Sequence, residues 1–261
     1  MHWIYSVPLF PLGVLISLAF VTVGVAGMWL THRHVRPHLA VREHHTEFTA
    51  VIIEGILIIY GLAIALILVS VWENYAEAST LVSNEATAIA MLYRDSGAYP
   101  EPTRGRLHEE LRGYTEYVVK RAWPEQRRGG TPIEGVAWMN RVQDELFKFE
   151  PETESQKILH AETLHAFNHL IEARRLRLDA VRFGMPAAMW AVVILGALIS
   201  LTASFLFQVD SGRLHYTMVG LLACLMGLVV FLIVSYDAPF RGTHGVDAEP
   251  YELVLTQLTD L

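Results

Sequence analysis

Four long apolar segments alternate with polar ones along the chain, two before a polar stretch of over a hundred residues and two after it. They cover residues 8–30, 48–72, 186–208 and 214–236. At about 1.5 Å per residue, each is long enough to cross a hydrocarbon layer of roughly 30 Å. Because none shows the alternation of barrel strands, the pattern predicts an all-α integral membrane protein with four transmembrane helices.

The apolar segments divide the chain into four parts. We expect transmembrane helices 1 and 2 in residues 1–72, a helical cytoplasmic insert at 73–185, transmembrane helices 3 and 4 in 186–236, and a C-terminal tail at 237–261. The first segment could also be an uncleaved signal sequence, but Met1-His2-Trp3 supplies no positive n-region, and the apolar run exceeds a typical signal sequence. We interpret it as a true span.

The polar insert is predicted to be helical throughout. No Gly or Pro interrupts residues 73–94, so the second membrane helix should continue into water until a breaker cluster at 96–102. Further helices are expected at about 103–123, up to about Phe149, and at about 154–183. We expect the last of these to be continuous with the third span, because no breaker separates Arg174 from Phe183. The last follows capping residues at Pro151-Glu-Thr-Glu-Ser, and its apolar face is Leu164, Phe167, Ile171 and Leu178.

Charge and composition narrow the function. The insert holds 15 Lys and Arg against 18 Asp and Glu, which is unlike a nucleic-acid surface, so we expect no nucleic-acid partner. The only cysteine, Cys224, lies in the fourth apolar segment, which leaves no disulfide framework or thiolate metal site. Nucleophile elbows, P-loops and dinucleotide fingerprints are absent. We therefore expect no enzyme and no cofactor.

Orientation is not decided by charge. With four spans, both termini and the insert share one side of the membrane, flanked by five arginines, and four arginines flank the other side. We assign the insert and the termini to the cytoplasm.

The second apolar segment carries a candidate ion pathway. At roughly 100° per residue, Glu43, Glu47 and Glu54 share one face of a single helix. The same face continues through Ile58, Gly61, Ala65, Leu68 and Trp72. In an oligomer with this face inward, carboxylate rings would open into an apolar neck, an arrangement that attracts cations. Alternatively, Glu54 is structural, at interface depth or paired with an arginine of the first loop.

Two histidine groups suggest other chemistry. The loop residues His32, His34, His38, His44 and His45 could bind a metal or sense pH. The spacing Glu162-x-x-His165-x-x-x-His169-x-x-Glu172 includes the Glu-x-x-His step of di-iron bundles. Its four residues lie opposite the apolar face of their helix, whereas ligands of a bundle-core metal must point inward. We therefore expect a solvated surface and no metal site.

Small residues recur every four positions on the other spans. They are Gly196, Ser200 and Ser204; Gly220 and Cys224; Ala223 and Gly227; and Gly13 and Ser17. This spacing predicts close helix contacts within or between subunits.

The order of these segments resembles a known family. The chain contains Ser83-Asn-Glu-Ala-Thr-Ala, Tyr114-Thr-Glu-Tyr-Val-Val-Lys-Arg-Ala-Trp, Arg174-Arg-Leu-Arg-Leu, Met185-Pro-Ala-Ala-Met-Trp and Tyr236-Asp-Ala-Pro-Phe-Arg-Gly. In these residues it resembles the bacterial bestrophin-like proteins catalogued as the DUF4239 domain, from about Glu54 to Glu252. The resemblance implies a bacterial inner-membrane location and a ring of subunits, commonly five, around a pore lined by the second transmembrane helix.

The implied partners are membrane lipids, copies of the chain itself and permeating ions. Bestrophins have an apolar neck rich in Ile and Phe, whereas this chain has Ile58, Gly61, Ala65 and Leu68 there. The anion preference of animal members therefore does not transfer directly, and the carboxylates favour cations. Two functions remain open at this point, an oligomeric channel and a membrane-anchored signalling or interaction module without conduction. The clean spans argue against a transporter.

Overall fold

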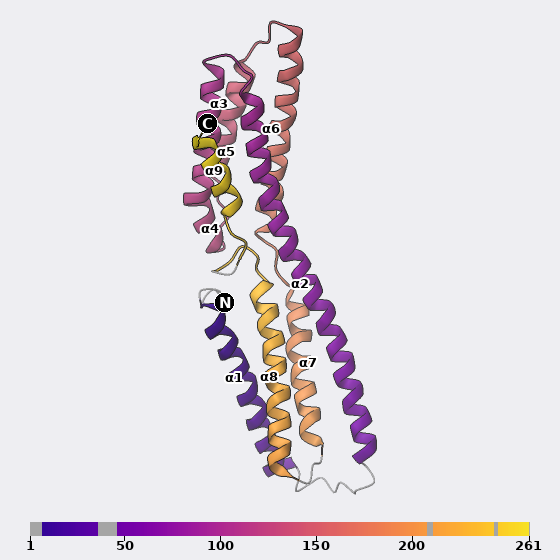
Figure 1. Ribbon diagram of the computed structural model, residues 1–261. Coiled ribbons are helices and arrows are strands. Elements are labelled where there is room, and N and C mark those ends of the chain that lie inside the picture. The colour runs from indigo at the N-terminus through magenta and orange to yellow at the C-terminus, as the bar shows by residue number, and fades with distance from the viewer. Residues whose placement is uncertain (1–6, 36–45, 208–210, 243–244, 261) are drawn as a thin grey trace. The chain divides into compact units, whose positions relative to one another are not determined.

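The computed structural model describes residues 7–35, 46–207, 211–242 and 245–260, and every regular element in these ranges is a helix (Figure 1). The helices are α1 (Leu9–Leu30), α2 (Thr46–Ser96), α3 (Thr103–Tyr117), α4 (Trp123–Arg127), α5 (Gly135–Lys148), α6 (Glu154–Ala180), α7 (Ala187–Leu206), α8 (Gly212–Tyr236) and α9 (Glu249–Asp260). Two π-helical turns, η2 (Thr31–Val35) and η5 (Val118–Ala122), extend α1 and α3. The predicted all-α fold is confirmed.

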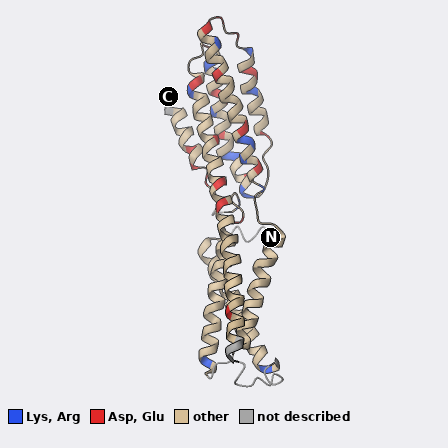
Figure 2. Ribbon diagram, turned by 90° about the vertical axis from the view of Figure 1, so that its right-hand side faces the viewer, with Lys and Arg blue, Asp and Glu red and all other residues tan. Residues whose placement is uncertain are grey.

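Four helices are long and apolar enough to cross a membrane. They are α1 with its π turn, α2, α7 and α8. Lys, Arg, Asp and Glu are sparse along these spans and frequent on the other helices (Figure 2). The four predicted spans are therefore confirmed, and the protein is a membrane protein.

The chain forms two compact units. The membrane unit comprises Met1–Glu73 and Gly184–Asp237, and the polar unit comprises Asn74–Phe183 and Ala238–Leu261. Helix α2 contributes its first half to the membrane unit and its last half to the polar unit, as expected from a segment without Gly or Pro between residues 73 and 94. Each unit therefore contains about half of α2.

The membrane unit is packed through small residues. A Cβ added at Gly227 of α8 would lie 2.8 Å from the Ser17 Cα of α1, and one added at Gly24 would lie 3.0 Å from the Ala223 Cβ. In lipid, helices associate through such close packing of their backbones. The hydrophobic effect does not drive this association, because lipid tails are as apolar as the side chains. The predicted contacts of Ser17, Ala223 and Gly227 thus lie within one protomer, whereas Gly220 has no neighbour within 4 Å.

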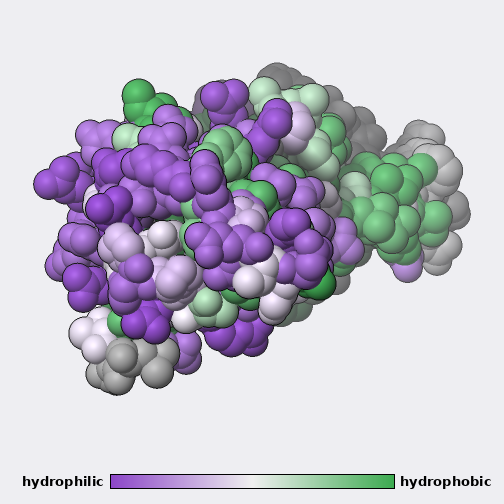
Figure 3. All heavy atoms as spheres, turned by 90° about the horizontal axis from the view of Figure 1, so that it is seen from above, coloured by the Kyte–Doolittle hydropathy of each residue, from purple (hydrophilic) through white to green (hydrophobic). Residues whose placement is uncertain are grey.

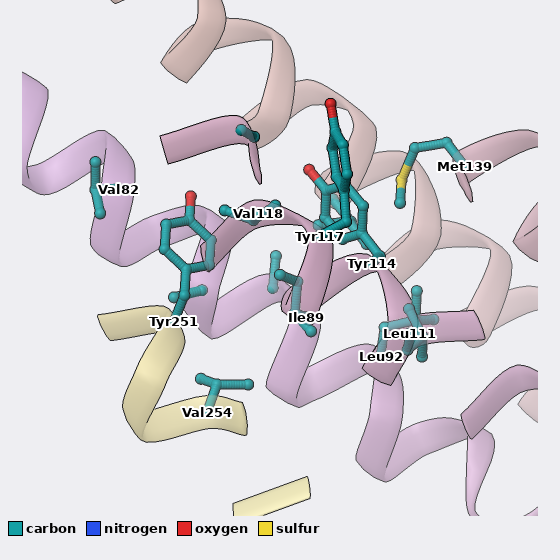
Figure 4. Close-up of a cluster of buried hydrophobic side chains, with 14 of the residues drawn as sticks. Val82, Ile89, Leu92, Leu111, Tyr114, Tyr117, Val118, Met139, Tyr251 and Val254 are labelled. Carbon is teal, nitrogen blue, oxygen red and sulfur yellow. The ribbon is translucent and has the colours of Figure 1, made fainter. Parts of the chain in front are cut away.

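The polar unit encloses a conventional hydrophobic core. Ile89 and Leu92 of α2, Leu111 and Tyr114 of α3, and Tyr251 of α9 are buried together (Figure 4). The face seen in Figure 3 is mainly hydrophilic on this unit. Since such a unit buries apolar area against water, hydrophobic burial supplies most of its stability.

The insert differs from the sequence prediction at its third helix. Helix α6 begins as expected, with a capping box between Thr153 and Gln156, but it ends at Ala180 and not near residue 183. Pro186 is the N-cap of α7, with φ of −56° and ψ of 147°. A proline also disfavours helical conformation in the residue before it, so α6 does not run on into α7. The predicted continuity of the insert with the third span is therefore wrong.

The buried side of α6 includes residues outside the predicted apolar face, and the C-terminal tail contains a helix. Phe167 is buried as predicted, but Leu170 and Arg177 lie beside it in the core, while Leu178 is only partly buried. The tail forms the helix α9, which contributes Tyr251 and Val254 to the polar unit (Figure 4).

Candidate functional site

One face of α2 is fixed to the membrane unit. The Tyr60 hydroxyl donates to the Val193 carbonyl oxygen of α7 at 3.0 Å. Its ring lies against Gly196, where an added Cβ would approach the Tyr60 Cδ2 to 2.4 Å. Farther toward the C-terminal end of α2, Ile64 and Val71 are buried against α7 and α8. Gly196 therefore makes room for the tyrosine that anchors α2.

The candidate pathway face of α2 is largely left uncovered. Glu54, Ile58, Gly61, Ala65 and Trp72 are all exposed in the protomer, and a Cβ added at Gly61 would meet nothing within 4 Å. Leu68 is an exception, because it is half-buried and packs against the membrane core. The Trp72 ring makes an edge contact with Tyr236, with centroids 5.2 Å apart. Five of the predicted residues thus remain available to another molecule.

A second apolar face of α2 is uncovered as well. Its residues are Ile59, Leu62, Leu66 and Val69, all more than half exposed. Counted at 100° per residue, this face lies beside the Glu54 face and away from Tyr60. Two neighbouring faces of α2 are therefore uncovered and can contact lipid, ions or another copy of the chain.

Glu54 has no ion-pair partner among the residues that the structure describes. The arginine of the first loop that is described, Arg33, lies over the Trp29 ring at 5.6 Å. The Glu47 side chain, with Glu43, Arg36 and Arg42, falls outside the described part of the chain. A carboxylate within a membrane-spanning helix normally faces protein or water and not lipid.

The described histidines of the first loop do not gather into a metal site. His32 packs near two residues of α8, with ring centroids 5.9 Å from both His215 and Tyr216. His34 is exposed, and His38, His44 and His45 lie outside the described residues. Within the described ranges, no three or more His, Cys, Asp or Glu residues converge in a way that could hold a metal ion.

The Glu162 to Glu172 spacing lies on the solvent side of α6. Glu162, His165, His169 and Glu172 are all exposed. Their position agrees with the solvated surface expected from the apolar pattern of the helix.

A buried ion pair that the sequence did not reveal lies in the polar unit. Arg177 of α6 pairs with Glu85 of α2, and both are within 1% of complete burial. The Arg177 Nη1 also donates to the Gln126 Oε1 at 2.8 Å, and the Tyr114 hydroxyl donates to Glu85. The Tyr251 ring lies 5.8 Å from the guanidinium carbon. The pair therefore joins α2, α3, α4, α6 and α9.

The electrostatics of this group favour a fixed charge pair. Burial lowers the pKa of Arg177, but the Glu85 charge, the neighbouring Tyr251 and Tyr114 and the hydrogen bond to Glu85 together raise that pKa well above its ordinary value. Burial, reinforced by the Glu85 charge, raises the pKa of the Tyr114 hydroxyl. Burial likewise raises the pKa of Tyr251. At neutral pH the arginine stays charged and both tyrosines stay neutral, so Arg177 supplies a fixed positive charge beside Glu85.

Comparison with known proteins identifies the family. The family model described as the bestrophin-like domain matches residues 18–251, which is most of the chain. The chain belongs to the bestrophin-like family. No curated protein matches it in sequence.

Solved bestrophin structures share its fold. A single-residue variant of a bacterial bestrophin homologue from Klebsiella pneumoniae is 11% identical, with a TM-score of 0.66, over 95% of this chain and 98% of that one. A second variant of the Klebsiella homologue is 12% identical, with a TM-score of 0.63, over 95% of this chain and 98% of that one. A structure described only as a membrane protein is 10% identical, with a TM-score of 0.64, over 95% and 97% of the two chains. The bestrophin-like fold predicted from the sequence is confirmed.

The segment that most clearly carries the bestrophin-like resemblance, Asp237 to Gly242, is structural. The Asp237 Oδ1 accepts a hydrogen bond from the Met185 backbone N–H at 2.6 Å, which secures the chain ahead of α7. In the polar unit, Phe240 is buried against Trp123. The Gly242 N–H donates to the Arg127 carbonyl oxygen at 3.3 Å from a backbone with φ of 75°, which glycine adopts without strain.

Proposed function

We propose that this bestrophin-like protein is a homo-oligomeric ion channel of the bacterial inner membrane, with its pore lined by one face of α2. The face consists of Glu47, Glu54, Ile58, Gly61, Ala65, Leu68 and Trp72. The observation that carries the proposal is that the protomer fixes α2 through Tyr60 while leaving Glu54 and most of this face uncovered. Family membership supports the same function.

An oligomer resolves the position of Glu54. A lone carboxylate facing lipid is costly, whereas a carboxylate facing a water-filled axis is not. A ring of copies would place the Glu54 face toward the axis, and the adjacent Ile59, Leu62 and Leu66 face toward a neighbour or lipid. We propose a pentamer, the assembly implied by the bestrophin resemblance.

The charge of the face favours cations. A ring of like carboxylates in a low-dielectric vestibule raises the local concentration of cations and excludes anions, and this effect grows with the number of subunits. Farther along, Gly61 and Ala65 leave space for ions, while Ile58 and Leu68 make the wall apolar.

Current measurements in reconstituted bilayers test the pathway. We expect Glu54→Gln to shift the reversal potential toward lower cation selectivity, and Ala65→Trp to block the current by filling the narrow part of the pore. Leu66→Trp is the matched control, because it places the same indole ring one residue away on the other uncovered face. Unchanged reversal potentials and currents in Glu54→Gln and Ala65→Trp would show that this face does not line a pore.

Oligomeric state and orientation need separate measurements. Mass determination of the detergent-solubilised protein should give a pentamer, and a monomer would contradict the proposal. For orientation, single cysteines at the exposed positions Thr131 and Ser155 of the polar unit should react only with reagents that enter the cytoplasm, in a Cys224→Ser background. Labelling from outside the cell would reverse the assigned topology.

The alternative is a membrane-anchored interaction module. Its support is the exposed Ile133, Phe147 and Ile158 side chains on the polar unit, each more than 60% accessible. An intact oligomer that carries no current, together with a soluble partner lost on Phe147→Ser, would favour this alternative.

A further inference from the structure

A groove lies on the surface of the membrane unit between α1 and α8, which run side by side (Figure 1). Its volume is about 550 Å³. It is lined by Val21, Thr22, Val25, Ala26 and Trp29 of α1 and by Tyr216 of α8. Most of these side chains are exposed in the protomer, so the groove is open to whatever surrounds the membrane helices.

The groove is apolar and has the length of one lipid leaflet. Its one hydroxyl on α1, that of Thr22, already donates to the Leu18 carbonyl oxygen at 2.7 Å. The small side chain of Ala26 leaves the hollow. From Val21 to Trp29 the helix advances about 12 Å at about 1.5 Å per residue. One leaflet contributes about 15 Å to the hydrocarbon layer, so the groove can hold most of an acyl chain from one side of the membrane.

The end of the groove is aromatic and basic. The Arg33 guanidinium carbon lies 5.6 Å from the centroid of the Trp29 ring. On α8, Arg213 precedes Tyr216 by three residues and therefore lies one turn away on the same side of the helix. The His32 ring, with its centroid 5.9 Å from that of Tyr216, shows that the last turn of α1 is close to the first turn of α8.

Both arginines are available to a ligand. Arg33 and Arg213 are exposed, and neither forms an ion pair with another residue that the structure describes. A guanidinium donates two parallel N–H groups to a phosphate, a geometry that an ammonium lacks. Trp and Tyr side chains gather at the headgroup level of a membrane, where the ring is apolar and its polar edge meets water.

We propose that this groove binds an anionic phospholipid, with an acyl chain along Val21 to Trp29 and the phosphate beside Arg33 and Arg213. A free phosphate would use the two arginines but leave the apolar groove empty. A zwitterionic lipid would bring its own cationic group close to both arginines, which offsets the attraction of its phosphate. The inference concerns the membrane unit alone and does not depend on ion conduction.

Photolabelling of the full-length protein in phosphatidylcholine vesicles tests the site. The vesicles contain a small fraction of either phosphatidylglycerol or phosphatidylcholine with a photoreactive acyl chain, and peptide mass spectrometry locates the adducts. On residues 21–29, phosphatidylglycerol adducts should exceed phosphatidylcholine adducts, with a contribution of about fivefold from each arginine. Arg33→Gln and Arg213→Gln should each lower this preference about fivefold, and the double variant should lose it.

Two controls separate the groove from general attraction to the membrane. Ala26→Trp fills the hollow and should remove the adducts on residues 21–29, whereas Val23→Trp places the same ring on an exposed side of α1 outside the groove and should keep them. Arg182→Gln removes an exposed arginine ahead of α7 and should leave the preference unchanged.

Three results would overturn the proposal. The first is equal labelling of residues 21–29 by the two lipids in the wild type. The second is a preference that persists in the double arginine variant, or that is the same on every membrane helix. The third comes from a photoreactive side chain placed at Val25: a cross-link to a second copy of the chain, with no lipid adduct, would show that protein and not lipid covers the groove.

Discussion

The two units hold the same helix by different physics. In the membrane unit, the Tyr60 ring fits the space that Gly196 leaves, and its hydroxyl donates one hydrogen bond to the Val193 carbonyl oxygen. In the polar unit, α2 is fixed by Glu85, which forms a buried ion pair with Arg177. In lipid, helices gain from close fit, since apolar burial brings no advantage over lipid tails. In a unit surrounded by water, burial drives folding, and a buried charge must be matched by its partner.

This contrast predicts different weak points in the two units. The membrane unit should be sensitive to the volume of a single methyl group at a helix contact, and the polar unit to the balance of charge in its core. The following predictions test the difference, and all use thermal unfolding of the full-length protein in one detergent.

The largest effect should come from breaking the buried pair on one side. Arg177→Met leaves the Glu85 charge buried without a partner, which costs about 3–5 kcal/mol and should lower the melting temperature by roughly 10 °C or more. Combining Arg177→Met with Glu85→Gln should restore most of the loss, since the glutamine still accepts the Tyr114 hydroxyl. The proposal that charge balance stabilises this core would be contradicted if Arg177→Met had the melting temperature of the wild type. It would also be contradicted if the double variant melted at a lower temperature than Arg177→Met alone.

In the membrane unit, the largest effect should come from a methyl group. Gly227→Ala would bring its Cβ to 2.8 Å from the Ser17 Cα, and since backbone cannot rotate away, α1 and α8 must separate. We expect a loss of about 1–3 kcal/mol. Gly220→Ala, on the same helix with nothing within 4 Å in the protomer, is the matched control for helix propensity. Equal melting of both variants would contradict a packing limit at Gly227.

The sequence predicted much of this fold because it depends on local signals. Unbroken apolar runs gave the four spans, and the absence of Gly and Pro after Trp72 gave the long α2. The Arg177–Glu85 pair was not predicted, because the two residues are 92 positions apart and an arginine among helix-surface charges is normally solvated. Only the helical phase of α6, with Phe167, Leu170 and Arg177 on one side, hinted at it.

The candidate pathway is predictable only in part for a similar reason. The face of Glu54, Gly61 and Ala65 follows from helical periodicity, but what covers a face depends on other helices. Leu68 belongs by angle to the same face, yet it packs against the membrane core because it lies at the edge toward α7 and α8. The anchor Tyr60 was missed because an aromatic residue in an apolar run gives no sequence signal of its partner.

A smaller effect should follow from the single hydrogen bond of that anchor. Tyr60→Phe removes the donor to the Val193 carbonyl oxygen but keeps the ring beside Gly196, so we expect a loss of about 0.6–2 kcal/mol. In a Gly196→Ala background the ring is already displaced, and the same change should have almost no effect. Additive losses in the double variant would show that the fit at Gly196 and the hydrogen bond act independently.

The smallest effect should come from ion pairs on the surface of the polar unit. Glu145 lies between Lys148 and Arg106, and its hydrogen bond to Lys148 lowers its pKa below the ordinary 4.5. Its contribution is therefore present above about pH 4.5 and is lost as the pH falls through the lowered pKa. Because water screens such pairs, Glu145→Gln should cost less than about 1 kcal/mol at neutral pH and nothing well below the lowered pKa. Glu154→Gln, in a more exposed pair with Lys157, should cost still less. A loss at Glu145 as large as that of Arg177→Met would show that the polar unit depends on its surface charges and not on its buried pair.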